Sequence, residues 1–199
     1  MGLDIFFYRR AKHTDAENTA INNVINAVRN EPENTDCVEI AKQKQILKQD
    51  LRDKGISTML SVDMDSYIGR GEQRVYYLTF NRKDTKQCGY FRKVNFLTRF
   101  FNYEENCSDQ PVTKDELAVL VESCDKVLKA AKKVKGEDIY TIDKEVAEKE
   151  LPTQSGFFFG STEYDNWYIQ DIKEVRKFAK RMLSTFDFEK NDLILHCWW

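Results

Sequence analysis

The segment from 151 to 168, LPTQSGFFFGSTEYDNWY, holds the densest group of residues that could bind a ligand. A proline and a glycine end any helix that precedes it, and Ser161, Thr162 or Asp165 could each cap a helix that follows. Free N–H groups at a helix N-terminus favour an anion, and Tyr and Trp rings can stack on a flat group. An ordinary loop whose rings belong to the core remains the alternative. The candidate ligand-binding residues here are Gly160, Ser161, Tyr164, Asp165 and Trp167.

A second group of residues that could bind a ligand lies in the middle of the chain, at Arg92, Lys93 and Asn95. Arginine and lysine can hold an anion, and an Asn side chain supplies both a donor and an acceptor. The apolar spacing around them predicts an amphipathic helix over 90–103, so a solvated helix face is the alternative interpretation. We add Asp4 to the candidate ligand-binding residues, as an acid that is either buried with a partner or exposed at the end of a strand.

Motifs of known catalytic and metal-binding sites are missing. The glycines around 156–161 lack the lysine of a phosphate-binding loop, and Ser155 lacks the glycine that a nucleophile elbow requires. The two histidines, His13 and His196, have no partner at ligand spacing. We therefore predict no metal and no cofactor, and we favour a protein that is not an enzyme.

Composition and charge restrict the class of protein. The chain has 199 residues, of which 41% are hydrophobic and 32% charged, as in a soluble globular protein. A net charge of −2 argues against broad nucleic-acid binding. Five widely spaced cysteines without a C-x-x-C pair fit reduced thiols in the cytoplasm. No apolar run of membrane-spanning length is present, so we expect no membrane association.

The elements that must position these residues can be predicted from periodicity. Alternation predicts strands over 3–9 and 192–199, and a hairpin from strands 56–64 and 75–80 with a turn at 69–71. Helices are predicted over 14–30, 36–54, 113–131 and 165–183 in addition to 90–103. Alternation would also place Phe157 and Phe159 on one face and Phe158 on the other.

The predicted fold class is α+β. The sheet is expected to be small and mostly antiparallel, formed by the N- and C-terminal strands plus the hairpin, and packed against four to five helices.

Three stretches, MGLDIFFYRR, YFRKVNFLTRFF and LPTQSGFFFGSTEYDNWY, resemble a family of small uncharacterised proteins encoded by bacteriophages and prophage-like regions of bacteria. The resemblance covers about half of the chain: residues 1–10, 89–102, more loosely 105–131, and 148–185. It implies a bacterial cytoplasm and gives weight to the Arg-Lys-x-Asn motif, but it implies no activity. The length of 199 residues suggests one domain over 1–199, and the resemblance suggests an insertion at 13–85, formed by a helical hairpin and a β-hairpin.

Three functional hypotheses follow. The first is a binding protein without catalysis that takes a small anionic or nucleotide-like ligand, and whose phage version sequesters a nucleotide signal or counters a host defence protein. The second is an enzyme acting on a nucleotide or phosphorylated compound through Asp4, Glu163 or Asp165. The third is a protein-interaction module that uses the helices of 14–54 to bind a host protein.

Overall fold

The computed structural model describes residues 2–30, 36–56, 60–68, 74–82, 84–137 and 139–199. The chain divides into two compact units, of which unit 1 comprises Met1–Arg10 with Lys86–Trp199 and unit 2 comprises Ala11–Thr85. The predicted turn at 69–71 and the first residues of the predicted strand 56–64 lie outside the described residues. No helix of the described ranges is long and apolar enough to span a membrane.

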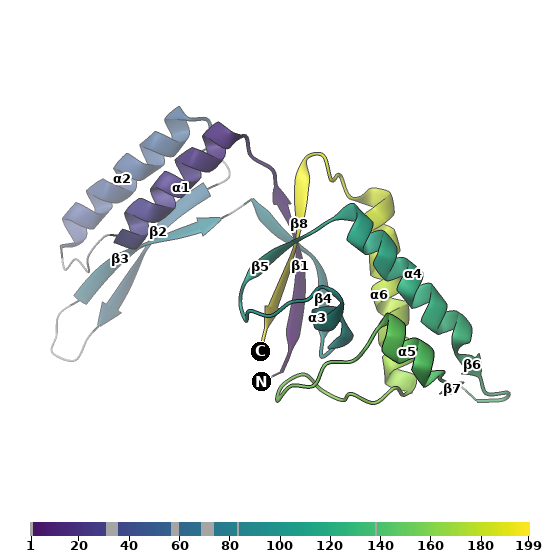
Figure 1. Ribbon diagram of the computed structural model, residues 1–199. Helices are drawn as coiled ribbons and strands as arrows, with labels where there is room; N and C mark the ends of the chain where they lie inside the picture. The colour runs from purple at the N-terminus through teal and green to yellow at the C-terminus, as the bar shows by residue number, and fades with distance from the viewer. Residues whose placement is uncertain (1, 31–35, 57–59, 69–73, 83, 138) are drawn as a thin grey trace. The chain divides into compact units, whose positions relative to one another are not determined.

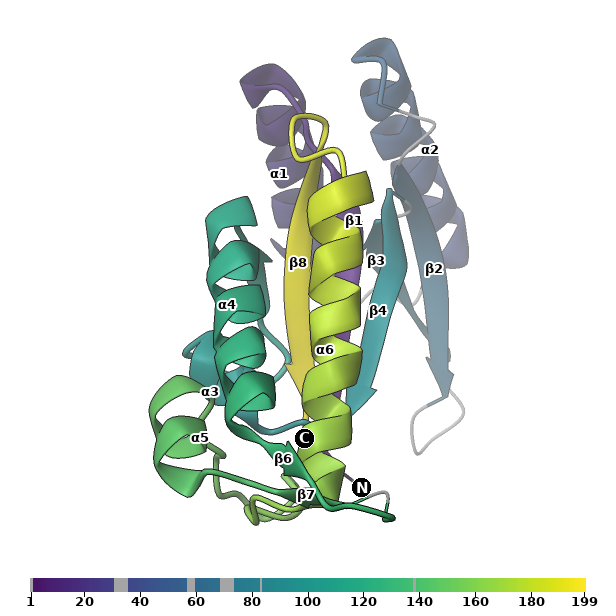
Figure 2. The same ribbon diagram turned by 90° about the vertical axis from the view of Figure 1, so that its right-hand side faces the viewer.

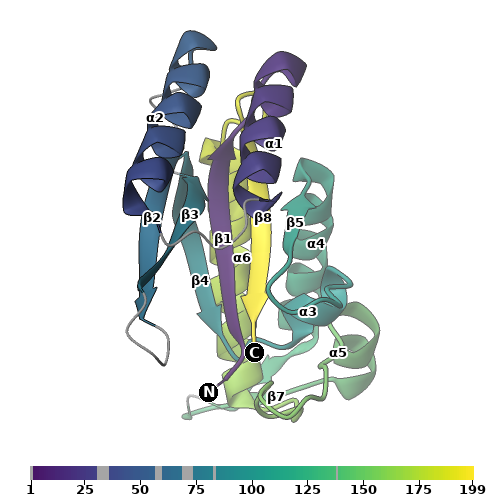
Figure 3. The same ribbon diagram turned by 90° about the vertical axis from the view of Figure 1, so that its left-hand side faces the viewer.

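Unit 1 is built on a four-stranded antiparallel sheet in the order β4-β1-β8-β5, which Figure 3 shows side by side. The N- and C-terminal strands are the two central ones, and both chain ends lie at the same end of the sheet (Figure 1). The strands are β1 (Asp4–Ala11), β4 (Thr85–Arg92), β5 (Asp109–Val112) and β8 (Asn191–Trp198), and the short β6 (Lys132–Lys133) and β7 (Tyr140–Thr141) form a separate pair.

One face of this sheet is covered by the long helices α4 (Lys114–Ala130) and α6 (Asn166–Thr185), which lie side by side in Figure 2. Alternation along β1 sends Leu3, Ile5 and Phe7 into this core, where each is completely buried. The apolar stripe of α6 faces the same core, and its residues are all buried: Tyr168, Ile172, Val175, Ala179 and Met182. The remaining helices are the short α3 (Phe96–Phe100) and α5 (Lys144–Glu150).

Unit 2 has its own small core. Helices α1 (Asp15–Asn30) and α2 (Cys37–Asp53) pack on a separate two-stranded sheet of β2 (Leu60–Ile68) and β3 (Arg74–Arg82). A capping box formed by Thr14 and Glu17 starts α1, and Gly55, with a left-handed backbone, follows α2. The hairpin therefore pairs within this unit and does not join the central sheet, which corrects its expected place.

The α+β fold with a small antiparallel sheet is confirmed. The helix expected over 90–103 is wrong, since Thr85–Arg92 is a strand and only Phe96–Phe100 is helical. The cause lies between them: Lys93 has a φ of 61°, a left-handed conformation that no α-helix accommodates.

Candidate functional site

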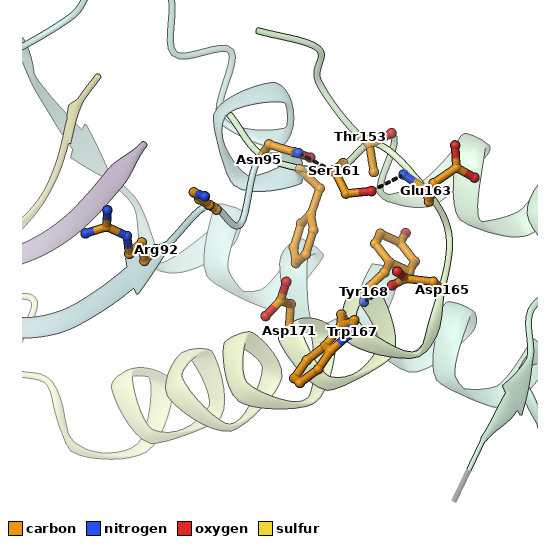
Figure 4. A pocket seen from close by; sticks show the side chains of 12 residues that line it. Arg92, Asn95, Thr153, Ser161, Glu163, Asp165, Trp167, Tyr168 and Asp171 are labelled. Atoms are coloured by element: carbon orange, nitrogen blue, oxygen red, sulfur yellow. Dashed lines mark hydrogen bonds between the residues drawn. The ribbon is translucent and has the colours of Figure 1, made fainter. Parts of the chain in front are cut away.

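A cavity of about 240 Å³ lies in unit 1, where the end of β4, the 151–165 loop and the start of α6 come together (Figure 4). The two segments singled out in the sequence therefore share one cavity. Its lining comprises Arg92, Lys93, Asn95, Phe96, Thr153, Gly160, Ser161, Glu163, Asp165, Trp167, Tyr168 and Asp171. All the predicted ligand-binding residues belong to it except Tyr164 and Asp4.

The 151–165 loop is held in place by the side chain of Asn95, which is 3% exposed. Its Nδ2 donates to the carbonyls of Phe159 (3.2 Å) and Ser161 (2.8 Å), and its Oδ1 accepts from the backbone N–H of Gln154 (3.2 Å). These bonds occupy both ends of the amide. Asn95 therefore positions the cavity wall, whereas the sequence predicted that it would contact the ligand.

The three phenylalanines of the loop form a turn, with the N–H of Phe159 bonded to the carbonyl of Gly156. Phe157 is 95% exposed and Phe159 is 6% exposed, so the two do not share a face as alternation predicted. A turn has no two-residue repeat, which is why the prediction failed. The carbonyl of Phe158 accepts from the N–H of Leu3 and ties the loop to the start of the central sheet.

Lys93 supplies the available positive charge of the cavity. Its side chain is exposed and, among the described residues, makes no ion pair. Its N–H donates to the carbonyl of Leu3, which helps to hold its left-handed backbone. Gly160, with a φ of 89°, lies against it: a Cβ at this position would be 3.1 Å from the Cβ of Lys93. The loop must therefore carry a glycine where the lysine passes.

Arg92 is oriented differently from Lys93. In Figure 4 its guanidinium points away from the other labelled lining residues, and its Nη1 lies 3.3 Å from Oδ1 of Asp4. The same Asp4 oxygen accepts from the hydroxyl of Tyr90 at 2.5 Å. Asp4 is 8% exposed, so of its two interpretations the buried and partnered acid is correct. Arg92 therefore lines the cavity while its guanidinium is engaged with Asp4.

Tyr164 belongs to the interior of the loop. Its hydroxyl accepts from the N–H of Thr153 at 3.2 Å, and its ring packs edge-on against Tyr168 with 4.9 Å between centroids. Asp165, one of three candidate caps, is the N-cap of α6 and accepts from the N–H of Tyr168 at 3.0 Å. Asp165 thus belongs to the wall of the cavity, while Tyr164 supports the loop from behind it.

An aromatic ring and three carboxylates complete the lining. Trp167 is 78% exposed, so the face of its indole is open to a ligand. Glu163, Asp165 and Asp171 add negative charge. Burial, together with the charges of Asp165 and Glu174, raises the pKa of Asp171 to about 6.

Asp171 was missed in the sequence, although a signal for it exists. It lies four residues after Trp167 on α6, and residues at this spacing share a helix face. The lining residues Phe96, Thr153 and Tyr168 were also missed as site residues, because their exposure to the cavity depends on how the loop folds over β4. In the part of the chain that the structure describes, no three His, Cys, Asp or Glu side chains are grouped so that they could hold a metal ion.

Comparisons with family models, with curated proteins and with solved structures gave no match to this chain. The chemistry of the cavity is therefore inferred from its own residues.

Proposed function

We propose that this protein binds a nucleotide-like ligand carrying a single phosphate group and does not transform it. The observation that carries the proposal is the presence, in the lining of one cavity, of Lys93, for which the described residues supply no ion pair, and of Trp167, whose indole is exposed. An ammonium attracts a phosphate. An indole stacks on a purine or pyrimidine whatever its identity, because every base has a π-face.

The balance of charge in the cavity restricts the class of ligand that it can bind. Three carboxylates line the cavity against two cations, and one of those cations, Arg92, is engaged with Asp4. A triphosphate would meet repulsion from the carboxylates, whereas a monophosphate leaves them free to accept hydrogen bonds from ribose hydroxyls or base N–H groups. The volume of about 240 Å³ lies just below the usual range of ligand sites, which favours a ligand no larger than one nucleotide. Nucleoside monophosphates and cyclic mononucleotides are thus the favoured class.

The resemblance to bacteriophage-encoded proteins suggests a biological role for such binding. A small protein that holds a nucleotide without consuming it would lower the free concentration of that nucleotide in a bacterial host. A phage would gain from this if the nucleotide were a signal for host defence.

Isothermal titration calorimetry and thermal shift with nucleoside monophosphates and cyclic mononucleotides test the proposal. Wild type should bind at least one of them, and Lys93→Ala should weaken that binding by roughly 10- to 100-fold, the loss expected for a charge-assisted contact. Arg92→Ala should have a much smaller effect, because the guanidinium faces Asp4.

The matched control is Lys129→Ala, which removes an exposed lysine from the last turn of α4. Trp167→Ala should also reduce affinity, while Trp167→Phe should retain most of it because a ring is kept. Equal affinity of Lys93→Ala and wild type, or no heat with any of these ligands, would refute the proposal.

One observation favours a catalytic alternative. A carboxyl with a pKa of about 6, as Asp171 has, can exchange a proton near neutral pH. Asp171 would then be a general acid or base acting on a bound phosphorylated compound. Chromatography after incubation with each nucleotide, with magnesium or manganese present, separates the two functions: recovery of intact ligand supports binding alone, and a product that Asp171→Asn no longer forms supports the enzyme.

A protein-binding function of the α1–α2 hairpin is supported by two exposed apolar side chains on α2, Val38 (59% exposed) and Ile46 (66% exposed). Single exposed apolar residues are common on protein surfaces, so this support is weaker than that for the cavity. A pull-down from bacterial extract with wild type and with Val38→Ser/Ile46→Ser tests it, and equal recovery of partners would count against it.

A further inference from the structure

The two edges of the central sheet differ in how they are protected. The β5 edge is only four residues long and contains Pro111, both of which discourage pairing with another strand. The β4 edge is eight residues long and has no proline. In the ranges that the structure describes, β4 pairs with β1 alone.

The backbone of β4 presents hydrogen-bonding groups at this edge. Arg181 of α6 donates to the carbonyl of Cys88 at 2.8 Å, so this carbonyl points away from β1 and toward the open side. Backbone groups two residues apart on a strand point the same way. The N–H and the carbonyl of Tyr90 are therefore directed outward, where an added strand could pair with them.

An apolar groove lies between this edge and α6. It contains a cavity of about 300 Å³ whose floor includes Phe91 and Phe178, with 5.4 Å between the ring centroids. The Phe178 ring packs directly against the backbone of Gly89, since a Cβ there would be 2.5 Å from the ring. We call this the β4–α6 groove, lined by Gly89, Tyr90, Phe91, Glu174, Lys177, Phe178 and Arg181.

The charge along the edge is positive, in contrast to the net charge of −2 for the chain. Lys177 and Arg181 flank the β4–α6 groove, with Glu174 as the one acid of its lining. A second cavity of about 360 Å³ at the start of β4 adds Arg9 and Lys86 against Asp187. The linings of the two cavities together hold four cations and two carboxylates.

We propose that the β4–α6 groove binds an acidic peptide segment in extended conformation, which pairs with β4 as an added strand. Addition of a strand to an open edge beside a helix is a general mode of peptide recognition, in which backbone bonds supply affinity and alternate side chains enter pockets. The inward side chains of the peptide would rest on Phe91 and Phe178. Acidic side chains at other positions on that same face of the peptide would meet Lys177 and Arg181. This site uses none of the residues that we assign to nucleotide binding.

Fluorescence anisotropy tests the proposal with a labelled peptide of eight residues, the length of β4, in which every second residue is serine and the residues between are valine and glutamate by turns, so that valine and glutamate share one face. We expect this peptide to bind with a Kd below about 1 mM. The same peptide with lysine in place of glutamate should bind at least about 5-fold more weakly. A version with every backbone nitrogen methylated, which cannot donate backbone hydrogen bonds, should not bind.

Lys177→Glu should weaken binding of the acidic peptide by about 5-fold, while Lys129→Glu on α4, the matched charge reversal, should not. Lys93→Ala should leave peptide binding unchanged, which separates this site from the nucleotide cavity. The proposal is overturned by equal binding of the N-methylated peptide, by no binding below about 1 mM, or by a dimer in which Tyr90 is already protected from amide exchange without peptide.

Discussion

Replacement of Asn95 by alanine gives the sharpest test of how the cavity is built. The change removes two bonds donated to the carbonyls of Phe159 and Ser161 and one bond accepted from the N–H of Gln154. Phe159 is 6% exposed, so its carbonyl would lose its partner in the interior, at a cost of about 1–3 kcal/mol. Ser161 is exposed and Gln154 is half-buried, so water can replace much of what they lose. We expect unit 1 to lose about 2–3 kcal/mol of unfolding free energy.

Tryptophan fluorescence during urea unfolding measures this loss in the right part of the molecule, because Trp167, Trp198 and Trp199 all belong to unit 1. Asn106→Ala is the matched control. The Asn106 amide also bonds at both ends, to the carbonyl and the N–H of Trp199 at 2.9 and 3.0 Å, but it is exposed, so its removal should cost less than about 1 kcal/mol.

Asn95→Ala should also lose the nucleotide affinity proposed above, because the loop that carries Gly160 and Ser161 would no longer be held. An unfolding free energy within about 0.5 kcal/mol of wild type would refute the role of Asn95 as the anchor of the loop. So would a loss no larger than that of the Asn106→Ala control.

Three further predictions follow. The raised pKa of Asp171, about 6 against an ordinary 3.8, means that its stabilising contribution is complete below pH 3.8 and is lost as the pH rises through 6. Asp171→Asn stays neutral at every pH. Its unfolding free energy relative to wild type should therefore rise by about 1 kcal/mol from pH 4 to pH 7.5, after allowance for the partial exposure of the carboxyl. Profiles of unfolding free energy against pH that run parallel for the two proteins would contradict this. Gly160→Ala should lower the stability of unit 1 by about 1–2 kcal/mol, because the φ of 89° and the contact with Lys93 both oppose a side chain; unchanged urea unfolding would be inconsistent with that geometry. Gly89→Ala should lower the unfolding free energy by about 2 kcal/mol, because the new Cβ clashes with the Phe178 ring. In a Phe178→Ala background the same substitution should cost much less. Additive effects of the two substitutions in this double-mutant cycle would show that the residues do not compete for space.

Local patterns were enough to predict several helices. The capping boxes at Thr14 and Thr113 and the apolar stripe of α4 act within a few residues of one helix, so the chain specifies them without tertiary contacts. The central position of the two terminal strands was also predictable, because both alternate and both are apolar enough to lie inside a sheet.

The segment around 90–103 could not be predicted in this way. Its apolar residues happen to fall at helical spacing, but Tyr90 lies on an edge strand, 45% exposed, and Val94 lies in the core. The change from strand to helix occurs at Lys93, which has a positive φ. The sequence does not predict this conformation, because lysine has no special preference for it. Contacts with Leu3 and Gly160, both distant in sequence, hold it there.

Residue types and their spacing thus identified the two segments that form the cavity, because unusual rings, glycines and charges are visible in the chain itself. The role of each residue was decided only by folding. Asn95 turned inward to bind the loop, Arg92 turned toward Asp4, and Asp171 entered the lining from the next turn of α6. Hydrogen-bond partners far apart in the sequence determine where a polar side chain points, and those partners are set by packing that a single segment does not encode.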